Sequence, residues 1–336
     1  MDAQMKHDVA SVADSADTIS TKFIRPKDER PRVTTSKDQL PEVPVIDFSI
    51  KDDEALVAQI YNVSSEWGIF QLVNHGIPDD VMSKLKEVGT QFFELSQQEK
   101  ETYASPPDAK IVDGYGSKLQ KEVDGVIEGR IDHLYNILHP CSAVNYQFWP
   151  KNPPSYREAT EEYTKYLLKV GERLLRCLSK GIGLEENELR AAVGGDDLVY
   201  LLKIIHYPPC PSPDLAFGFQ AHADMIAMTI LVPNDVQGLQ VSHQGNWIDA
   251  QYIPNALVIH IGGIIQIVSN GKYKAIIHRT TVHKEKARMS WPVFMVPPGD
   301  MDVGPHPKLV TEQNPAKYKT KKYIDYAYCK FDEIPL

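Results

Sequence analysis

The stretch Gln220–Pro233, QAHADMIAMTILVP, joins a His-x-Asp pair to a run of strand-forming residues. His222 and Asp224 are two residues apart, just before the apolar run Met228–Val232. Residues i and i+2 of a strand point to the same face, so both side chains can reach one point in space. We therefore expect the imidazole and the carboxylate to bind a common ligand, with a third group supplied from elsewhere.

The sequence around this stretch, from about 198 to 298, consists of short β-rich runs separated by turns. The turns read PPCPSPD, PND, HQGN, IPN and SNG. Short strands at even spacing with such turns are typical of a sandwich or a jelly roll, and they argue against a Rossmann sheet. The predicted fold class is therefore α+β, mainly β.

The first half of the chain carries helical patterns instead. The expected elements are strands at Val43–Ser49 and Gly68–Gly76 and helices at 53–66 and 79–95. The clearest helix starts at an S-x-x-E capping box, Ser155 and Glu158, and ends at Gly181. The segment 104–150 is mixed and predicts loops and short strands. An α-rich first half is thus expected to pack against a β-rich second half.

Composition restricts the classes of partner. The 336 residues include 36 Lys+Arg and 45 Asp+Glu, for a net charge of −9, which argues against duplex nucleic acid. No run reaches the roughly 18 apolar residues of a membrane span. Four cysteines without a CxxC pair fit a reducing compartment. We expect a soluble, cytoplasmic, monomeric protein that binds a small-molecule substrate, with neither a nucleic-acid partner nor a membrane span.

His278 is the candidate for the third ligand, because it ends another short apolar run 56 residues after His222. Two imidazoles and one carboxylate form the facial triad of non-haem Fe(II) oxygenases. This triad leaves coordination positions open for a bidentate co-substrate and O₂. His222, Asp224 and His278 are therefore the predicted metal ligands.

Arg288 and Ser290, in ARMSWPVF, follow His278 closely and share one face if they lie on a strand. A guanidinium binds a carboxylate through two parallel hydrogen bonds, and a nearby hydroxyl adds another. A 2-oxo acid requires this combination, since its keto and C1 carboxylate oxygens would chelate the iron while its far carboxylate meets Arg288.

These motifs together resemble those of the plant 2-oxoglutarate/Fe(II)-dependent dioxygenases. The resemblance rests on H-x-D…H…R-x-S, on YPPCPSPDLAFG before it and on SWPVF at its end. It extends into the first half through VPVIDFS, EWGIFQLVNHGIP, FFELSQQEK and GYGSKLQ. Within that family, FWPKNPPSYRE, ILVPNDVQGLQV, HRTTVHKEKARMSWPVF and YKTKKY resemble flavonol synthases most closely.

The resemblance implies a fold and a reaction. The fold is a double-stranded β-helix, a jelly-roll and cupin-like core flanked by N-terminal and supporting α-helices. The chain would be a single dioxygenase unit over 1–336, with a loosely ordered arm (1–40), a mostly helical region (41–195), the jelly-roll catalytic core (196–300) and a C-terminal segment (301–336). The expected cofactor is Fe(II), with 2-oxoglutarate and O₂ as co-substrates and ascorbate as a helper. The expected reaction is hydroxylation or desaturation of a plant phenolic, such as a dihydroflavonol in flavonoid biosynthesis.

The resemblance also implies roles for further residues. Tyr207, in HYPPCP, matches a family tyrosine that contacts 2-oxoglutarate. The residues at positions that line the substrate pocket of flavonol synthases are His133, Tyr135, Lys203, Phe294 and Val296. Tyr135 replaces a phenylalanine there, and Val296 replaces a glutamate that grips the flavonoid.

Three other positions depart from the family pattern. Ile205 stands where the family has an asparagine that helps to hold 2-oxoglutarate, His206 replaces a tyrosine, and Gly263 replaces the aspartate of HIGD. Loss of a polar contact to a buried partner costs about 1 kcal/mol or more. The pattern predicts a pocket retuned toward a less polar or differently oriented substrate.

Three alternatives remain open at this stage. One is a related dioxygenase retuned to another specialised metabolite, such as an alkaloid or a lignan. Another is a catalytically silent binding protein that keeps the fold. A zinc hydrolase would leave Arg288 and Ser290 without a purpose, and no HExxH motif is present. Among the remaining histidines, His260 is expected to be hydrogen-bonded within a buried strand.

Overall fold

The structure is a computed structural model that describes Ile24 and residues 41–105, 113–119, 122–123, 126–127 and 130–331. The arm expected over 1–40 therefore lies outside the described residues, apart from Ile24. The helices are α1 (Asp53–Glu66), α2 (Asp79–Glu94), α3 (Gln97–Glu101), α4 (Tyr156–Gly181), α5 (Glu188–Ala192), α6 (Gly263–Val268) and α7 (Tyr323–Phe331). The predicted helices at 53–66 and 79–95, and the one ending at Gly181, are confirmed.

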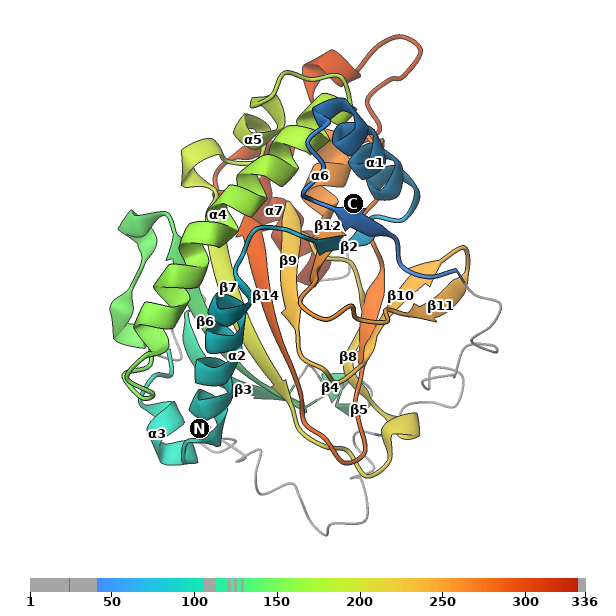
Figure 1. Ribbon diagram of the computed structural model, residues 1–336. Coiled ribbons are helices and arrows are strands. Elements are labelled where there is room, and N and C mark those ends of the chain that lie inside the picture. Colours follow the sequence, from blue (N-terminus) through green and yellow to red (C-terminus); the bar gives the residue numbers. More distant parts are fainter. Residues whose placement is uncertain are drawn as a thin grey trace, which may run out of the picture.

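Two sheets face one another in the core of the molecule (Figure 1). The larger sheet has the order β1 (Val45–Asp47), β2 (Ile69–Val73), β12 (Leu257–Ile261), β9 (Met228–Pro233), β14 (Arg288–Val296), β7 (Val199–Tyr207), β6 (Arg130–His139) and β3 (Gly114–Leu119). The smaller sheet has the order β11 (Asn246–Asp249), β10 (Leu239–His243), β13 (His278–Thr281) and β8 (Phe217–His222). Two short pairs lie outside these sheets, β4 (Glu122–Val123) with β5 (Val126–Ile127), and β15 (Asp302–Val303) with β16 (Lys321–Lys322).

The chain passes back and forth between the two sheets from β7 onward. β7, β9, β12 and β14 belong to the larger sheet, while β8, β10, β11 and β13 belong to the smaller one. This alternation is a double-stranded β-helix, so the predicted jelly-roll core is confirmed. Sequence analysis missed that β1, β2, β3 and β6 extend the larger sheet from the half expected to be mostly helical. In particular, β6 is a ten-residue strand within the segment expected to form only loops and short strands.

Strand alternation on β14 separates a helix-facing side from a side that faces the smaller sheet. Met289, Trp291, Val293 and Met295 belong to the main core cluster, together with buried residues of α2 and α4. Trp291 lies so close to α2 that a Cβ at Gly89 would be 2.5 Å from its indole nitrogen. Arg288, Ser290 and Phe294 alternate with these residues and point the other way.

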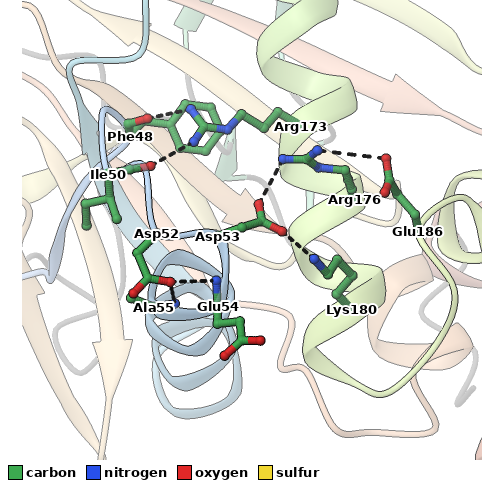
Figure 2. Close-up of polar contacts among 10 residues, drawn as sticks. All are labelled: Phe48, Ile50, Asp52, Asp53, Glu54, Ala55, Arg173, Arg176, Lys180 and Glu186. Carbon is green, nitrogen blue, oxygen red and sulfur yellow. Dashed lines mark hydrogen bonds and ion pairs between the residues drawn. The ribbon is translucent and has the colours of Figure 1, made fainter.

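Helix α4 spans the helix layer and holds the β1–α1 segment in place (Figure 2). The Arg173 guanidinium donates to the carbonyls of Phe48 and Ile50, at 2.5 and 3.2 Å. Arg176 and Lys180 both contact the Asp53 carboxylate at the start of α1. Ser155 is the N-cap of α4 but makes no side-chain capping bond, because its backbone (φ −83°, ψ 1°) is not extended. The predicted capping box is therefore wrong.

Across the part of the chain that the structure describes, no helix is both long enough and apolar enough to cross a membrane.

The buried carboxyl of Asp113, at the entry to β3, should make stability depend on pH. It accepts a hydrogen bond from the Gly114 amide at 3.0 Å, and burial raises its pKa to about 6. Between about pH 4 and 6 the folded chain then holds a proton that the unfolded chain has lost, so rising pH destabilises the fold at this site. Asp113→Asn removes this titration.

We expect the free energy of unfolding of Asp113→Asn, relative to the wild type, to increase by up to about 3 kcal/mol from pH 4 to pH 7. Urea unfolding at several pH values measures this difference. A difference that stays constant over this range would contradict the assignment to Asp113.

Candidate metal centre

The structure brings the three predicted ligands together where β8 ends and β13 begins. His222 ends β8, His278 begins β13, and the two are register partners with ring centroids 4.2 Å apart. The Asp224 carboxylate lies between them, with Oδ1 at 3.5 Å from His222 Nε2 and Oδ2 at 3.9 Å from His278 Nε2. One ligand atom from each residue can therefore converge on a single ion.

Backbone carbonyls fix the orientation of both imidazole rings. His222 Nδ1 lies 2.8 Å from the carbonyl of Gln220, and His278 Nδ1 lies 3.3 Å from that of Ile276. Because a carbonyl only accepts, Nδ1 carries the proton in each ring and the lone pair is on Nε2, which faces Asp224. This is the ring orientation of a metal-binding histidine.

The protonation states also fit a divalent cation. Burial, together with the neighbouring His222, lowers the pKa of His278 well below its usual range, so this imidazole is neutral. A neutral imidazole is the form in which a histidine binds such a metal.

Thr229, on β9, contacts the Asp224 carboxylate. Its hydroxyl donates to Asp224 Oδ2 at 2.7 Å. Sequence analysis missed this residue, although Thr229 is the single hydroxyl in the apolar run that follows the His-x-Asp pair.

Arg288 is a buried cation that is ready to bind an anion. Arg288 is only 2 % exposed, and its Nη2 donates a hydrogen bond to the Tyr252 hydroxyl at 3.0 Å. Nε and Nη1 are buried and have no hydrogen-bond partner among the described residues. Two unpartnered donors on a buried guanidinium are the donor set that a carboxylate satisfies. Tyr252 was not selected from the sequence.

The surroundings of Arg288 match the other predicted co-substrate residues. The Tyr207 ring lies 5.1 Å below the guanidinium, and buried Ser290 follows two residues along the same face of β14. Gly238 makes room for the arginine, since a Cβ there would lie 2.9 Å from Arg288 Cδ. Gly238 also pairs with Thr281 at the end of β13 opposite His278. The length of strand from His278 to Thr281 is roughly 10 Å, which suits a five-carbon diacid that is held at both ends.

Aromatic and cationic side chains form a wall that leads to the metal ligands. On β6, the rings of His133 and Tyr135 are 4.8 Å apart. Lys203 Nζ, on β7, lies 5.1 Å from the Tyr135 ring and 5.8 Å from that of Phe219. Phe219 in turn lies 4.4 Å from the His222 ring. Sequence analysis missed Phe219; the available signal was its place on the strand that carries His222.

Gly116 shapes the same wall from β3. It is the register partner of His133, and a Cβ there would lie 2.7 Å from His133 Nε2. The glycine in GYGSKLQ therefore allows the His133 ring to occupy its place.

The remaining predicted residues differ in their neighbours and in the face of the sheet from which they project. Phe294 is the register partner of Thr229, so it shares the face that points toward Asp224. Val296 follows two residues later and packs against the main core cluster. Ile205 is the partner of both Ser290 and His133, which places an apolar side chain beside the anchor. His206 points to the helix layer, where it stacks on Phe93, so its substitution does not change the pocket.

Comparisons with known proteins agree along the whole chain. Residues 198–297 match the 2OG-Fe(II) oxygenase superfamily, and residues 43–152 match the N-terminal region described as non-haem dioxygenase in morphine synthesis. A flavonol synthase/flavanone 3-hydroxylase of Eustoma exaltatum subsp. russellianum is 57 % identical over 335 residues, covering 100 % of both chains. One of Petunia hybrida is 55 % identical, covering 97 % of this chain and 94 % of its own.

A solved structure, JOX2 in complex with 2OG, Fe and JA, is similar with a TM-score of 0.87 at 34 % identity. The match covers 97 % of this chain and 93 % of that one. A binary complex of the Arabidopsis thaliana dioxygenase for auxin oxidation with 2-oxoglutarate has a TM-score of 0.70 at 24 % identity, over 81 % of this chain and 99 % of that one.

Proposed function

The chain belongs to the 2OG-Fe(II) oxygenase superfamily, and from that premise we propose that it oxidises a dihydroflavonol to a flavonol, as a flavonol synthase does. The prediction of a 2-oxoglutarate- and Fe(II)-dependent dioxygenase is confirmed, so neither the silent binding protein nor the zinc hydrolase is retained. The observation that carries the proposal is the pairing of a convergent His-Asp-His set with a buried guanidinium that has two unpartnered donors.

The proposed metal ligands are Nε2 of His222, a carboxylate oxygen of Asp224 and Nε2 of His278. Fe(II), when bound, supplies the activation of O₂ that accompanies loss of CO₂ from 2-oxoglutarate. Arg288 would hold the far carboxylate of 2-oxoglutarate through Nε and Nη1, with Ser290 and Tyr207 beside it. This arrangement fixes the co-substrate at both of its ends.

We assign the substrate pocket to the predicted residues and to Phe219. The wall of His133, Tyr135, Lys203, Phe219 and Phe294 offers flat aromatic surfaces, which suit a flavonoid ring system. Lys203 supplies a cation that attracts a phenolic oxygen, and Val296, two residues beyond Phe294 on β14, adds an apolar side chain. The wall also excludes water from the reacting centre.

The overall reaction balances as a desaturation. Dihydroflavonol, 2-oxoglutarate and O₂ give flavonol, succinate, CO₂ and water. The two hydrogens removed from C2 and C3 and one oxygen atom of O₂ leave as water, and the other oxygen atom enters succinate. The chain contributes orientation and exclusion of solvent, and the bound metal contributes the oxidising power.

Succinate formation by the iron-loaded protein tests this proposal. We expect 2-oxoglutarate consumption to be stimulated by dihydrokaempferol or dihydroquercetin, and a flavonol to appear. A flavanone serves as a second arm, because the relatives are named for both activities. Slow succinate release that none of these compounds stimulates would contradict the substrate assignment and favour the retuned dioxygenase that Ile205 and Val296 suggest.

We also propose that the protein acts in the cytoplasm as a monomer and as one unit over 1–336. The three described cysteines, Cys141, Cys177 and Cys210, are free thiols, which supports a reducing compartment. Side chains from both halves share the main core cluster, which supports a single unit. Gel filtration should give a mass near 37.8 kDa.

A further inference from the structure

A third histidine, beyond the two predicted as metal ligands, lies beside the predicted metal centre. His260, on β12, is the register partner of Thr229, so both side chains point toward Asp224. Its Nδ1 lies 3.8 Å from Asp224 Oδ2, and its ring centroid lies 4.6 Å from that of His278. The residue is 3 % exposed.

The expectation that His260 is hydrogen-bonded within its strand is wrong. Both ring nitrogens are buried and have no hydrogen-bond partner among the described residues. A buried imidazole without a partner carries a desolvation cost that nothing offsets. The other four residues of this strand are all leucine, valine or isoleucine. A histidine that only packed would therefore give no stability that an aliphatic side chain could not.

The two oxygens of the Asp224 carboxylate have different surroundings. Oδ1 faces His222 Nε2 at 3.5 Å. Oδ2 lies 3.9 Å from His278 Nε2, but it accepts the Thr229 hydroxyl at 2.7 Å and faces His260 Nδ1 at 3.8 Å. Because donors gather on Oδ2, Oδ1 is the oxygen left for the metal. A carboxylate that binds through both oxygens would occupy one of the positions that a chelating 2-oxo acid needs.

We propose that His260 is a positioning residue that, together with Thr229, holds Asp224 Oδ2 and keeps the carboxylate a one-oxygen ligand. The separation of 3.8 Å must shorten by roughly 0.9 Å for Nδ1–H to donate a hydrogen bond. His260 acts through Asp224 and does not touch the co-substrate. The inference rests on the proposed role of Asp224 as a metal ligand.

Anaerobic binding of 2-oxoglutarate to the Fe(II)-loaded protein tests this role without turnover. The visible charge-transfer absorption of the Fe(II)–2-oxoglutarate complex reports its Kd, and calorimetry reports the Kd for Fe(II) alone. We expect His260→Leu to raise the Kd for 2-oxoglutarate at least about tenfold while Fe(II) binding is retained. His260→Asn, which can place an amide N–H near the position of Nδ1, should restore most of the affinity.

Ile259→Val is the matched control, because Ile259 is buried on the opposite face of the same strand. It should leave both Kd values unchanged. If His260→Leu does not fold, Thr229→Val replaces it, since it removes the other donor to Oδ2 and should raise the same Kd.

Two outcomes would overturn the inference. An unchanged Kd for 2-oxoglutarate in folded His260→Leu, or in Thr229→Val where that variant replaces it, would show that the donors to Oδ2 do not matter. Complete loss of Fe(II) binding in folded His260→Leu would make His260 a ligand in its own right. Failure of the proposed function is distinguishable, because then the wild type itself would show no Fe(II)–2-oxoglutarate absorption.

Discussion

We expect Asp224→Ala to lower Fe(II)-dependent succinate formation by at least about 100-fold. Loss of a residue that only supports a metal ligand already costs up to about 100-fold, and Asp224 is a proposed ligand itself. The carboxylate is the sole anion of the predicted triad, and both imidazoles face it. Its removal leaves two imidazoles without an anionic ligand, and these cannot hold a divalent cation firmly. Succinate release and Fe(II) binding by calorimetry, measured on the same preparation, check this result.

Asp214→Ala is the control for Asp224→Ala. Asp214 is exposed and lies just before β8, so its loss removes a carboxylate from the same region without touching the triad. It should keep wild-type iron binding and turnover. Full succinate release by folded Asp224→Ala would show that the triad has been assigned wrongly.

Arg288→Lys should raise the KM for 2-oxoglutarate by at least about 30-fold, the equivalent of about 2 kcal/mol for a disrupted buried ion pair. A lysine keeps the charge but cannot present two parallel N–H donors to one carboxylate. The guanidinium is fully enclosed, so water cannot replace the lost donor. Steady-state kinetics with varied 2-oxoglutarate measure the change, and the KM for the phenolic substrate should move little.

Tyr252→Phe should raise the KM for 2-oxoglutarate less than Arg288→Lys does. It removes the phenol that accepts from Arg288 Nη2 at 3.0 Å but leaves the guanidinium itself. A loss of about 1 kcal/mol corresponds to roughly a fivefold rise in the KM for 2-oxoglutarate. If Arg288→Lys changed the KM for the phenolic substrate and left that for 2-oxoglutarate unchanged, the anchor would belong to the other ligand.

The clustering of the proposed metal ligands and of the proposed anchor residues could be predicted from the sequence, because strand periodicity places residues i and i+2 together. His222 with Asp224 and Arg288 with Ser290 are both such pairs, and short turns restrict where β13 and β14 can lie. The helices were predictable for the same reason, since the apolar spacing in α2 and α4 repeats at the helical period.

Contacts between strands that are distant in sequence could not be predicted. Tyr252 reaches Arg288 from a loop after β11, and His260 reaches Asp224 from β12, which pairs with β9 but follows it in the chain by more than 20 residues. Neither residue shares a local pattern with its partner. The long strand β6 was missed because its side chains alternate only weakly in polarity, and its pairing with β7 provides the order that its sequence lacks.

The most direct test of the central claim is the stoichiometry of one reaction. Iron-loaded protein receives 2-oxoglutarate and a dihydroflavonol under nitrogen, then O₂, and succinate and flavonol are measured together. We predict that one succinate forms for each flavonol and that omission of the dihydroflavonol suppresses both. Succinate that forms at the same rate without the dihydroflavonol, or no flavonol at all, would contradict the claim that this site couples the two oxidations.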